Sequence, residues 1–314
     1  MEPSSRALRA ALEARASLAG GAYRWVDGEH DGVTVDLFGE VAILSFYRPA
    51  DEALERAWAA ALVEAGGARS VYLKRRPKEA RRVANESLEA IAPVAPLVGP
   101  SVETLTAQEL GVSFLIRPAN GLSVGLYLDA RELRRRVREC AQGLRVLNLF
   151  AYTCGFGVAA RLGGATEVVN VDLSRRVLDW GAENYRLNGL TPAPGEFRAA
   201  EAFGELKLLS KRGRQFDLAI VDPPSFSTAK GERFSAEKDH ARLLQAVGAV
   251  MAPGATVYAC SNLDRWSLPE VERRSVAALA ALGARAVDRF GAPQLDFDAL
   301  PSRLKVVELR LRAQ

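Results

Sequence analysis

The sequence is poor in the residue types that build disulfide frameworks and metal centres. Its 314 residues include 3 cysteines and 2 histidines. The cysteines, Cys140, Cys154 and Cys260, lie far apart and form no Cys-x-x-Cys pair. His30 and His240 are too few for a histidine-rich centre. We therefore expect neither a disulfide framework nor a bound metal.

Long apolar segments are also missing. The N-terminal stretch MEPSSRALRAALEARASLAGG has no apolar core of the kind found in secretory signals. No run of about 18 apolar residues predicts a membrane-spanning helix. We therefore predict a cytoplasmic protein with no membrane partner. The net charge of +4 is compatible with an anionic partner, and equally with a small-molecule substrate.

The length is typical of two domains of roughly 150 residues each. A stretch rich in Pro and Gly at 92–103 reads as a linker. We interpret residues 1–106 as a small α/β domain and residues 107–314 as a second domain. A hairpin over 109–128, turning at Asn120-Gly121, is predicted to open the second domain.

From residue 144 onward, strand-like and helix-like segments alternate. The apolar runs LRVLNLF, EVVNVDL, FDLAIVD and ATVYACS are each followed by a segment of helical character. Strict alternation predicts an α/β fold with a doubly wound, mostly parallel sheet and right-handed crossovers. In such sheets ligands bind at the carboxyl ends of the strands, so the residues that follow each strand are the first candidates for a site.

The first strand-to-helix turn runs from Asn148 to Gly157 in the string NLFAYTCGFG. Small residues there allow close approach of a ligand to the backbone and to the helix N-terminus. The turn lacks the Gly-x-Gly-x-x-Gly of dinucleotide-binding enzymes. It therefore indicates a nucleotide-like ligand only weakly.

Acidic residues follow the next two strands. Asp172 can accept hydrogen bonds from a ribose; alternatively, either Asp172 or Ser174 can simply cap the following helix. Glu201 can accept from an adenine amino group, or it can be an ordinary solvated loop residue.

The string DPPSF, from Asp222 to Phe226, ends the fourth strand and is the most specific signal. Two prolines fix the backbone and remove two amide donors. The turn would present a carboxylate and carbonyl groups at the ligand-binding edge, and Phe226 offers a face on which a base can stack. The alternative is a purely structural turn.

Three strings, VLNLFAYTCGFGVAA, VDLSRRVLDWGAENYRLNGL and FDLAIVDPPSF, resemble motifs of class I S-adenosylmethionine (SAM)-dependent rRNA methyltransferases. The branch they resemble contains the 23S rRNA cytosine-C5 methyltransferases and the guanine-N7 half of a bifunctional 23S rRNA methyltransferase. The strings GLYLDARELRRRV and DGEHDGVTVDLFGEVAIL resemble parts of that branch upstream of these motifs. The resemblance extends over about residues 20–310.

This resemblance implies a Rossmann-like methyltransferase domain preceded by a small α/β domain, SAM as the cofactor, and RNA, with large-subunit rRNA favoured, as the partner. Asp222, Pro223 and Pro224 would flank the transferring methyl group, beside Phe226. The residues that it implies for cofactor binding are Asp129, Arg131, Asn148, Phe150, Tyr152, Thr153, Gly155, Asp172, Leu173, Ser174, Glu201 and Asp222.

The sequence departs from the cytosine-C5 pattern. Those members often carry a PUA domain, and we expect none here because the chain is too short at its N-terminal end. Their nucleophilic cysteine follows the fifth strand, where an ungapped match places Ser261, one residue past Cys260.

The segment CSNLDRWSL is more similar to the guanine-N7 members. We therefore favour guanine N7 and keep cytosine C5 open, with Cys260 as the nucleophile in that case. Asn262, Arg265 and Trp266 are candidates for contacts with a flipped base.

Clustered cations suggest where RNA phosphates bind. The candidates are Lys74, Arg75, Arg76, Lys78, Arg81 and Arg82. A second tract, Arg131 to Arg138, is a weaker candidate. Solvated helix faces are the ordinary explanation of such runs.

Two other functions use the same fold, because a fold does not fix a substrate. One is methylation of a protein or a small molecule. The other is a non-catalytic RNA-binding or assembly factor, which the intact Asp172 and DPP string disfavour.

Overall fold

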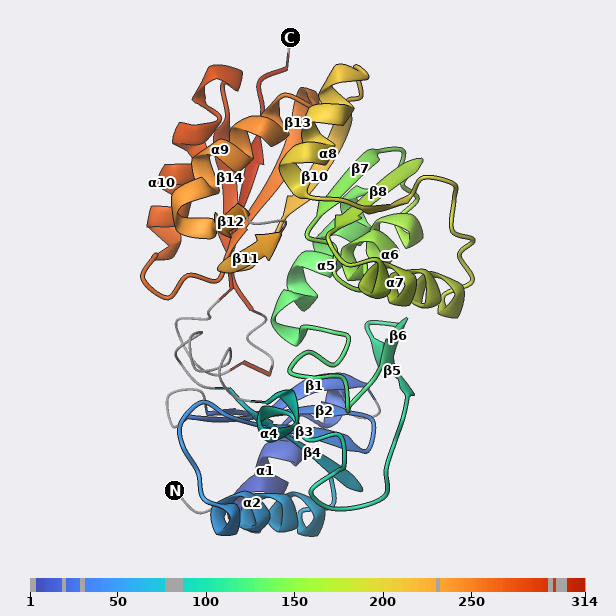
Figure 1. The fold of residues 1–314 in the computed structure, drawn as a ribbon, viewed down its shortest axis with the longest axis vertical. Coiled ribbons are helices and arrows are strands. Elements are labelled where there is room, and N and C mark those ends of the chain that lie inside the picture. The colour runs from blue at the N-terminus through green and yellow to red at the C-terminus, as the bar shows by residue number, and fades with distance from the viewer. Residues whose placement is uncertain are drawn as a thin grey trace. The chain divides into compact units, whose positions relative to one another are not determined.

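The computed structural model describes residues 4–18, 21–28, 32–76, 87–229, 232–292, 296–297 and 304–313. The chain divides into two compact units, whose elements are labelled in Figure 1. The first unit comprises residues 1–128 and 293–301, and the second comprises residues 129–292 and 302–314.

The first unit contains a four-stranded sheet in the order β1-β2-β3-β4. β1, β2 and β3 are antiparallel neighbours, whereas β4 is parallel to β3 because helix α2 carries the chain across. The elements are α1 (Ser5–Ala14), η1 (Ala16–Leu18), β1 (Ala22–Gly28), β2 (Val33–Phe38), β3 (Val41–Phe46), α2 (Glu52–Glu64), β4 (Ser70–Arg75), α4 (Leu88–Ile91), β5 (Leu105–Glu109) and β6 (Val112–Ile116).

Helices α1 and α2 enclose one hydrophobic core with this sheet. Asp51 caps α2 by accepting a hydrogen bond from the Leu54 amide at 2.8 Å, as short polar side chains do at helix N-termini. The buried Trp25 indole donates to the Leu8 carbonyl oxygen at 2.9 Å and ties α1 to β1. The small α/β domain predicted before the larger sheet is therefore confirmed.

The opposite face of β4 is covered by the segment 100–122. Side chains at alternate positions point to this face, because successive residues of a strand face opposite sides. Each of them hydrogen-bonds to the crossing segment: Ser70 to Pro100, Tyr72 to Val102, Lys74 to Pro118 and Arg76 to Leu122.

This packing corrects the expectation for Lys74 alone, which was predicted to contact RNA. Lys74 is 0% exposed and its Nζ donates to the Pro118 carbonyl oxygen at 2.8 Å, so it cannot reach a phosphate. The Arg75 guanidinium binds both carboxylate oxygens of the buried Glu55, at 2.6 and 2.7 Å. Arg76 donates to Leu122. The other members of the tract, Lys78, Arg81 and Arg82, lie outside the described residues.

The predicted hairpin exists, but its turn lies elsewhere, and the hairpin belongs to the first unit and not to the second. β5 and β6 pair around Leu110-Gly111, which both have positive φ, +51° and +76°. This backbone conformation suits a tight two-residue hairpin turn, and it replaces the turn expected at Asn120-Gly121. A bridge from Gln108 to Gly21 joins the hairpin to the first unit. The division of the chain falls at 128/129, whereas the sequence suggested 106/107.

The second unit contains a seven-stranded sheet in the order β14-β15-β13-β10-β7-β8-β9. The five strands from β13 to β9 are parallel, and β15 is antiparallel to both of its neighbours. Its elements are η2 (Leu128–Ala130), α5 (Arg131–Cys140), β7 (Arg145–Leu149), α6 (Gly155–Leu162), β8 (Glu167–Asp172), α7 (Arg175–Leu187), β9 (Phe197–Ala199), α8 (Ala202–Lys211), β10 (Phe216–Val221), β11 (Phe226–Ala229), β12 (Glu232–Ser235), α9 (Ala236–Gly248), β13 (Met251–Ser261), α10 (Leu268–Ala278), η3 (Ala280–Leu282), β14 (Arg285–Phe290) and β15 (Lys305–Arg310).

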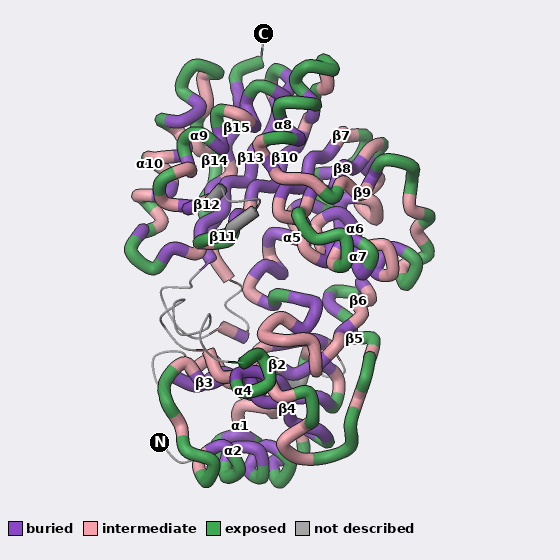
Figure 2. Tube along the Cα trace, in the orientation of Figure 1, coloured by how far each residue is buried: buried purple, intermediate pink, exposed green. Residues whose placement is uncertain are grey.

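Helices cover both faces of this sheet. Apolar residues of α8, α9 and α10 pack on one face, and those of α5 and α6 pack on the other. Alternate residues of each central strand enter the two cores, so these strands appear buried in Figure 2. The predicted doubly wound, Rossmann-like sheet is therefore confirmed.

The order of the strands fixes where a ligand can bind. The chain moves outward from β7 to β8 and β9, then returns across the sheet to β10 on the other side of β7. The carboxyl ends of β7 and β10 lie at the switch point of the topology, which is where open α/β sheets bind ligands.

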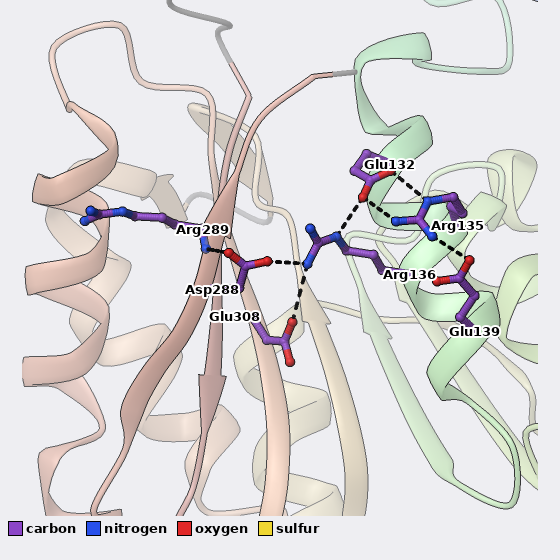
Figure 3. Close-up of polar contacts among 7 residues, drawn as sticks. All are labelled: Glu132, Arg135, Arg136, Glu139, Asp288, Arg289 and Glu308. Atoms are coloured by element: carbon purple, nitrogen blue, oxygen red, sulfur yellow. Dashed lines mark hydrogen bonds and ion pairs between the residues drawn. The ribbon is translucent and has the colours of Figure 1, made fainter. Parts of the chain in front are cut away.

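Two arginines of the second basic tract form ion pairs, Arg135 within α5 and Arg136 both within α5 and to the neighbouring strands. Figure 3 shows Arg135 held by Glu132 and Glu139, and Arg136 extended from α5 to Asp288 of β14. The Arg136 guanidinium also lies 4.0 Å from the centroid of the Phe290 ring. These arginines are therefore committed to the fold of the second unit.

Candidate active site

The turn between β7 and α6 has an unusual backbone. Phe150, Tyr152 and Cys154 all have positive φ, at +57°, +49° and +59°. A non-glycine residue in this region costs roughly 1–2 kcal/mol, and such strain persists where the surroundings enforce it. One enforcing contact is the hydrogen bond from the Ala151 amide to the Val171 carbonyl oxygen at 2.9 Å. The conformation of this turn, which lies at the switch point, is therefore fixed in part by its hydrogen bond to β8.

Asp172 braces this turn from the end of β8. Its Oδ2 accepts from the Tyr152 amide and its Oδ1 from the Ser174 amide, both at 2.9 Å. A carboxylate has about four acceptor positions, so a half-buried Asp172 can still accept from ribose hydroxyls. Its neighbours Leu173, 45% exposed, and Ser174 leave this side of the edge open.

Asn148 lies beneath the turn and not on its surface. It is fully buried, and its Nδ2 donates to Asn170 Oδ1 at 2.8 Å, while Asn170 Nδ2 donates to the Tyr185 hydroxyl at 3.0 Å. A side chain at Gly157 would lie 2.3 Å from Asn170 Oδ1, so glycine is needed for α6 to pack on this network. Asn148 therefore supports the turn from below, and its expected contact with the cofactor stays a prediction.

Other expected cofactor residues differ in how accessible they are. Phe150, Tyr152 and Gly155 are half-buried, whereas Thr153 is buried, with its carbonyl oxygen bonded to Asn184. Asn148 Oδ1 is buried and finds no hydrogen-bond partner among the described residues. An unsatisfied buried acceptor under a strained turn fits a site completed by a ligand or by water.

Glu201 has a local role that the sequence did not reveal. It is the N-cap of α8, where its two carboxylate oxygens accept from the amides of Phe203 at 3.0 Å and Gly204 at 2.8 Å. This capping satisfies the first amides of the helix. A contact with adenine would have to use the remaining acceptor positions.

Asp222 follows β10 at the carboxyl edge of the sheet, where it interacts with other charged side chains. Burial, reinforced by the nearby Asp129 carboxylate, raises its pKa to about 7, although the buried Arg134 opposes this shift. Arg131, one helical turn before Arg134, is also buried. The sequence placed Asp129 and Arg131 near the site but missed Arg134, whose three-residue spacing from Arg131 on a helix was the available signal.

The two prolines after Asp222 lead into an exposed aromatic ring. Pro223 is buried and Pro224 is exposed, and Phe226 at the start of β11 is 47% exposed. β11 pairs with β12, whose Phe234 ring lies 5.6 Å from that of Phe150. The DPPSF turn is thus linked to the strained turn after β7.

The end of β13 differs in part from expectation. Cys260 is buried, and burial together with Asp222 and Asp129 raises the pKa of its thiol well above the usual range. Trp266 is 4% exposed, with its ring beside His240, so it cannot stack on a flipped base as suggested. Arg265 is exposed and pairs with Glu237 at 2.5 Å.

The described residues show neither a metal-binding cluster nor a membrane-spanning helix. They contain no group of three or more His, Cys, Asp or Glu side chains that could hold a metal ion. None of their helices is long and apolar enough to cross a membrane.

Together, the topological switch point, the strained turn and the carboxylate at the end of β8 are typical of a Rossmann-like protein that binds a nucleoside-containing ligand. A family model described as S-adenosylmethionine-dependent methyltransferase matches residues 32–300. The chain belongs to this family of methyltransferases, whose cofactor is SAM.

Similar proteins agree with this assignment. The chain is 38% identical over 184 residues to ribosomal RNA large subunit methyltransferase I of Aeromonas salmonicida, covering 58% of this chain and 46% of that protein. It is 31% identical over 258 residues to ribosomal RNA large subunit methyltransferase K/L of Pseudoalteromonas translucida, covering 82% and 35%. The chain therefore matches less than half of the length of either relative.

A solved structure shares the fold over nearly the whole chain. It is described as a putative methyltransferase complexed with SAH, with a TM-score of 0.85 and 24% identity, covering 99% of this chain and 83% of that one.

Proposed function

We propose that this chain transfers the methyl group of SAM to a base of RNA, with guanine N7 of large-subunit rRNA as the favoured acceptor. The observation that carries the proposal is the half-buried Asp222 at the switch point, with the exposed Phe226 four residues on. A carboxylate beside an aromatic face suits a flipped purine. The names of the two relatives, both large-subunit rRNA methyltransferases, favour rRNA.

The cofactor would be held by the turn after β7 and by Asp172. Asp172 would accept from the ribose hydroxyls while keeping its bonds to Tyr152 and Ser174. Phe150, Tyr152 and Gly155 would face the methionine part, and Glu201 and Leu173 the adenine. When bound, SAM supplies an activated methyl group on a cationic sulfur.

The chemistry is an in-line displacement. The guanine N7 lone pair forms the new N–C bond as the S–C bond breaks, and the positive charge passes from sulfur to the base. No proton has to leave, so the protein needs to hold the base in line and stabilise the charge. The carboxyls of Asp222 and Asp129 are suited to a cationic methylated guanine.

Cytosine C5 needs more from the protein. A thiolate must first add to C6, because C5 is otherwise a poor nucleophile. Cys260 is buried and its pKa is raised by burial and by two carboxylates, which disfavours a thiolate. This environment supports a nitrogen acceptor over cytosine C5.

Labelling of RNA would test the proposal. The purified chain, tritiated SAM and rRNA from a strain lacking the corresponding gene should give labelled RNA, and nucleoside analysis should identify 7-methylguanosine. Protein extract and a small-molecule fraction serve as competing substrates.

Label in 5-methylcytidine, or covalent trapping of the protein by RNA containing 5-fluorocytosine, would show that the methyl acceptor is cytosine C5 and not guanine N7. Label in protein or metabolites alone would overturn the RNA substrate. Failure to bind SAM in calorimetry would overturn catalysis altogether.

A further inference from the structure

The chain after β13 forms a turn that is fixed from two sides. The Ser261 hydroxyl accepts from the Leu263 amide at 3.3 Å, and the buried Lys305 donates from Nζ to the Leu263 carbonyl oxygen at 3.2 Å. Ser261 and Lys305 are direct partners in the pairing of β13 with β15. Both neighbours of Asn262 are thus held in the turn, Ser261 through its hydroxyl and Leu263 through its backbone.

Strand alternation separates the residues of this turn. Cys260 enters the apolar core beneath the sheet, beside Tyr258 and Val306, whereas Ser261 is buried on the opposite side. Asn262 is half-buried, and its Nδ2 donates to Asp222 Oδ1 at 3.5 Å. The side chain of Asn262 therefore links the end of β13 to the carboxyl of Asp222, the candidate catalytic residue.

We propose that Asn262 is a positioning residue, which holds Oδ1 of Asp222 so that Oδ2 is directed to the acceptor base. The inference rests on the proposed function, because it assigns Asp222 to the acceptor. At 3.5 Å the bond is long, as catalytic hydrogen bonds often are before the substrate binds, and we expect it to shorten in the complex.

The charges around Asp222 make this bond useful. Asp129 of η2 disfavours the ionised carboxyl, Arg134 of α5 favours it, and Cys260 of β13 adds a buried thiol nearby. A donor on Oδ1 stabilises the charged form, which counteracts burial and Asp129. Removing the Asn262 amide should therefore raise the pKa of Asp222.

The first measurement needs neither RNA nor SAM. In protein labelled with ¹³C at aspartate carboxyls, Asp222→Asn identifies the Asp222 signal. Its titration should shift upward by about 0.5–1 pH unit in Asn262→Ala. Asn262→Asp keeps the size of the side chain but adds a like charge, so it should raise the pKa further.

The second measurement is methylation of rRNA as a function of pH. Asn262→Ala should lower kcat about tenfold near neutral pH and move the acid limb of the profile upward, with KM for RNA within about twofold. Asn188→Ala is the matched control, since the side chain of this half-buried asparagine of the same unit also donates a hydrogen bond, to the Asn184 carbonyl oxygen at 2.8 Å. It should leave both quantities unchanged.

An Asp222 titration that is the same in wild type, Asn262→Ala and Asn262→Asp would overturn the positioning role. So would a kcat of Asn262→Ala equal to that of Asn188→Ala at every pH. If wild type labels no RNA, the proposed function fails, and the carboxyl titration alone still decides whether Asn262 controls Asp222.

Discussion

Charged residues occur at strand ends in both units, with opposite consequences. In the first unit, Lys74 and Arg75 end β4, yet a crossing segment covers Lys74 and Glu55 pairs with Arg75. In the second unit, Asp172 and Asp222 end β8 or follow β10, and both are half-buried at the switch point. The charges of the first unit are paired within the fold, whereas those of the second unit lie at the carboxyl edge of the sheet, where such folds bind ligands.

The two units differ in whether another segment of the chain covers the ends of the strands that carry these charges. Parallel strands joined by helices leave their carboxyl ends as a shared edge, because each crossover returns the chain to the opposite end. The edge strand β4 has no such neighbour beyond it, and the segment 100–122 lies across its free face. A charge at a strand end thus indicates a site only where the topology leaves the end open.

The largest effect is expected for Asp222→Ala. Loss of the carboxyl should lower methylation on the order of a hundredfold, because the acceptor is no longer positioned. Since burial raises the pKa of Asp222 to about 7, activity that needs the ionised form should rise as the pH passes through 7. Tritium transfer from pH 5.5 to 8.5 would measure both effects.

Asp217, at the opposite end of the same strand, is the control. It pairs with Arg145 at 2.8 Å, so Asp217→Ala should reduce stability while the activity of the folded fraction is kept. Equal losses of activity in the two variants would remove the distinction between the two ends of β10.

Asp172→Ala should weaken SAM binding by about tenfold or more. The carboxylate would lose its bonds to ribose, and the turn would lose the brace at the Tyr152 amide. Isothermal titration with SAM is the measurement. Asp179→Ala, at an exposed position of α7, should bind SAM like wild type. An unchanged affinity in Asp172→Ala would contradict the ribose role.

Lys74→Met tests whether the buried lysine of the first unit contributes to stability and not to RNA binding. Burial, with Arg76 nearby, lowers the pKa of Lys74 to about 8, so between pH 8 and the normal lysine range the unfolded chain binds more protons. Wild type should therefore gain about 2 kcal/mol of stability relative to Lys74→Met between pH 7.5 and 10.

Urea unfolding at the two pH values measures this difference. The salt dependence of RNA binding should be the same in both proteins, because Lys74 cannot reach phosphates. A smaller salt slope in Lys74→Met would show that the covered lysine becomes available to RNA after all.

Cys260→Ser should have the smallest effect on catalysis. The thiol faces the apolar core, so activity should stay within about threefold of wild type, while a buried hydroxyl lowers stability by about 1–2 kcal/mol. A folded variant that binds SAM but transfers no methyl group would favour the cytosine-C5 mechanism.

Local sequence pattern is sufficient to predict the parallel sheet and the edge of it that binds ligands. Alternating strand and helix segments dictated the parallel sheet, and the carboxyl ends of such strands share one edge. This geometry is why the sequence alone assigns Asp172 and Asp222, 50 positions apart, to one region. The DPP string and the small residues after β7 are equally local signals.

The tertiary structure decided what depends on contacts between distant residues. Lys74 is covered by Pro118, 44 residues away, and Asn262 reaches Asp222 across 40 residues. The burial of Trp266 in the core of the second unit is likewise decided by packing. Periodicity predicts which way a side chain points within its own strand or helix, but another segment, placed by the whole fold, decides whether that direction leads to solvent, to a ligand or to a buried partner.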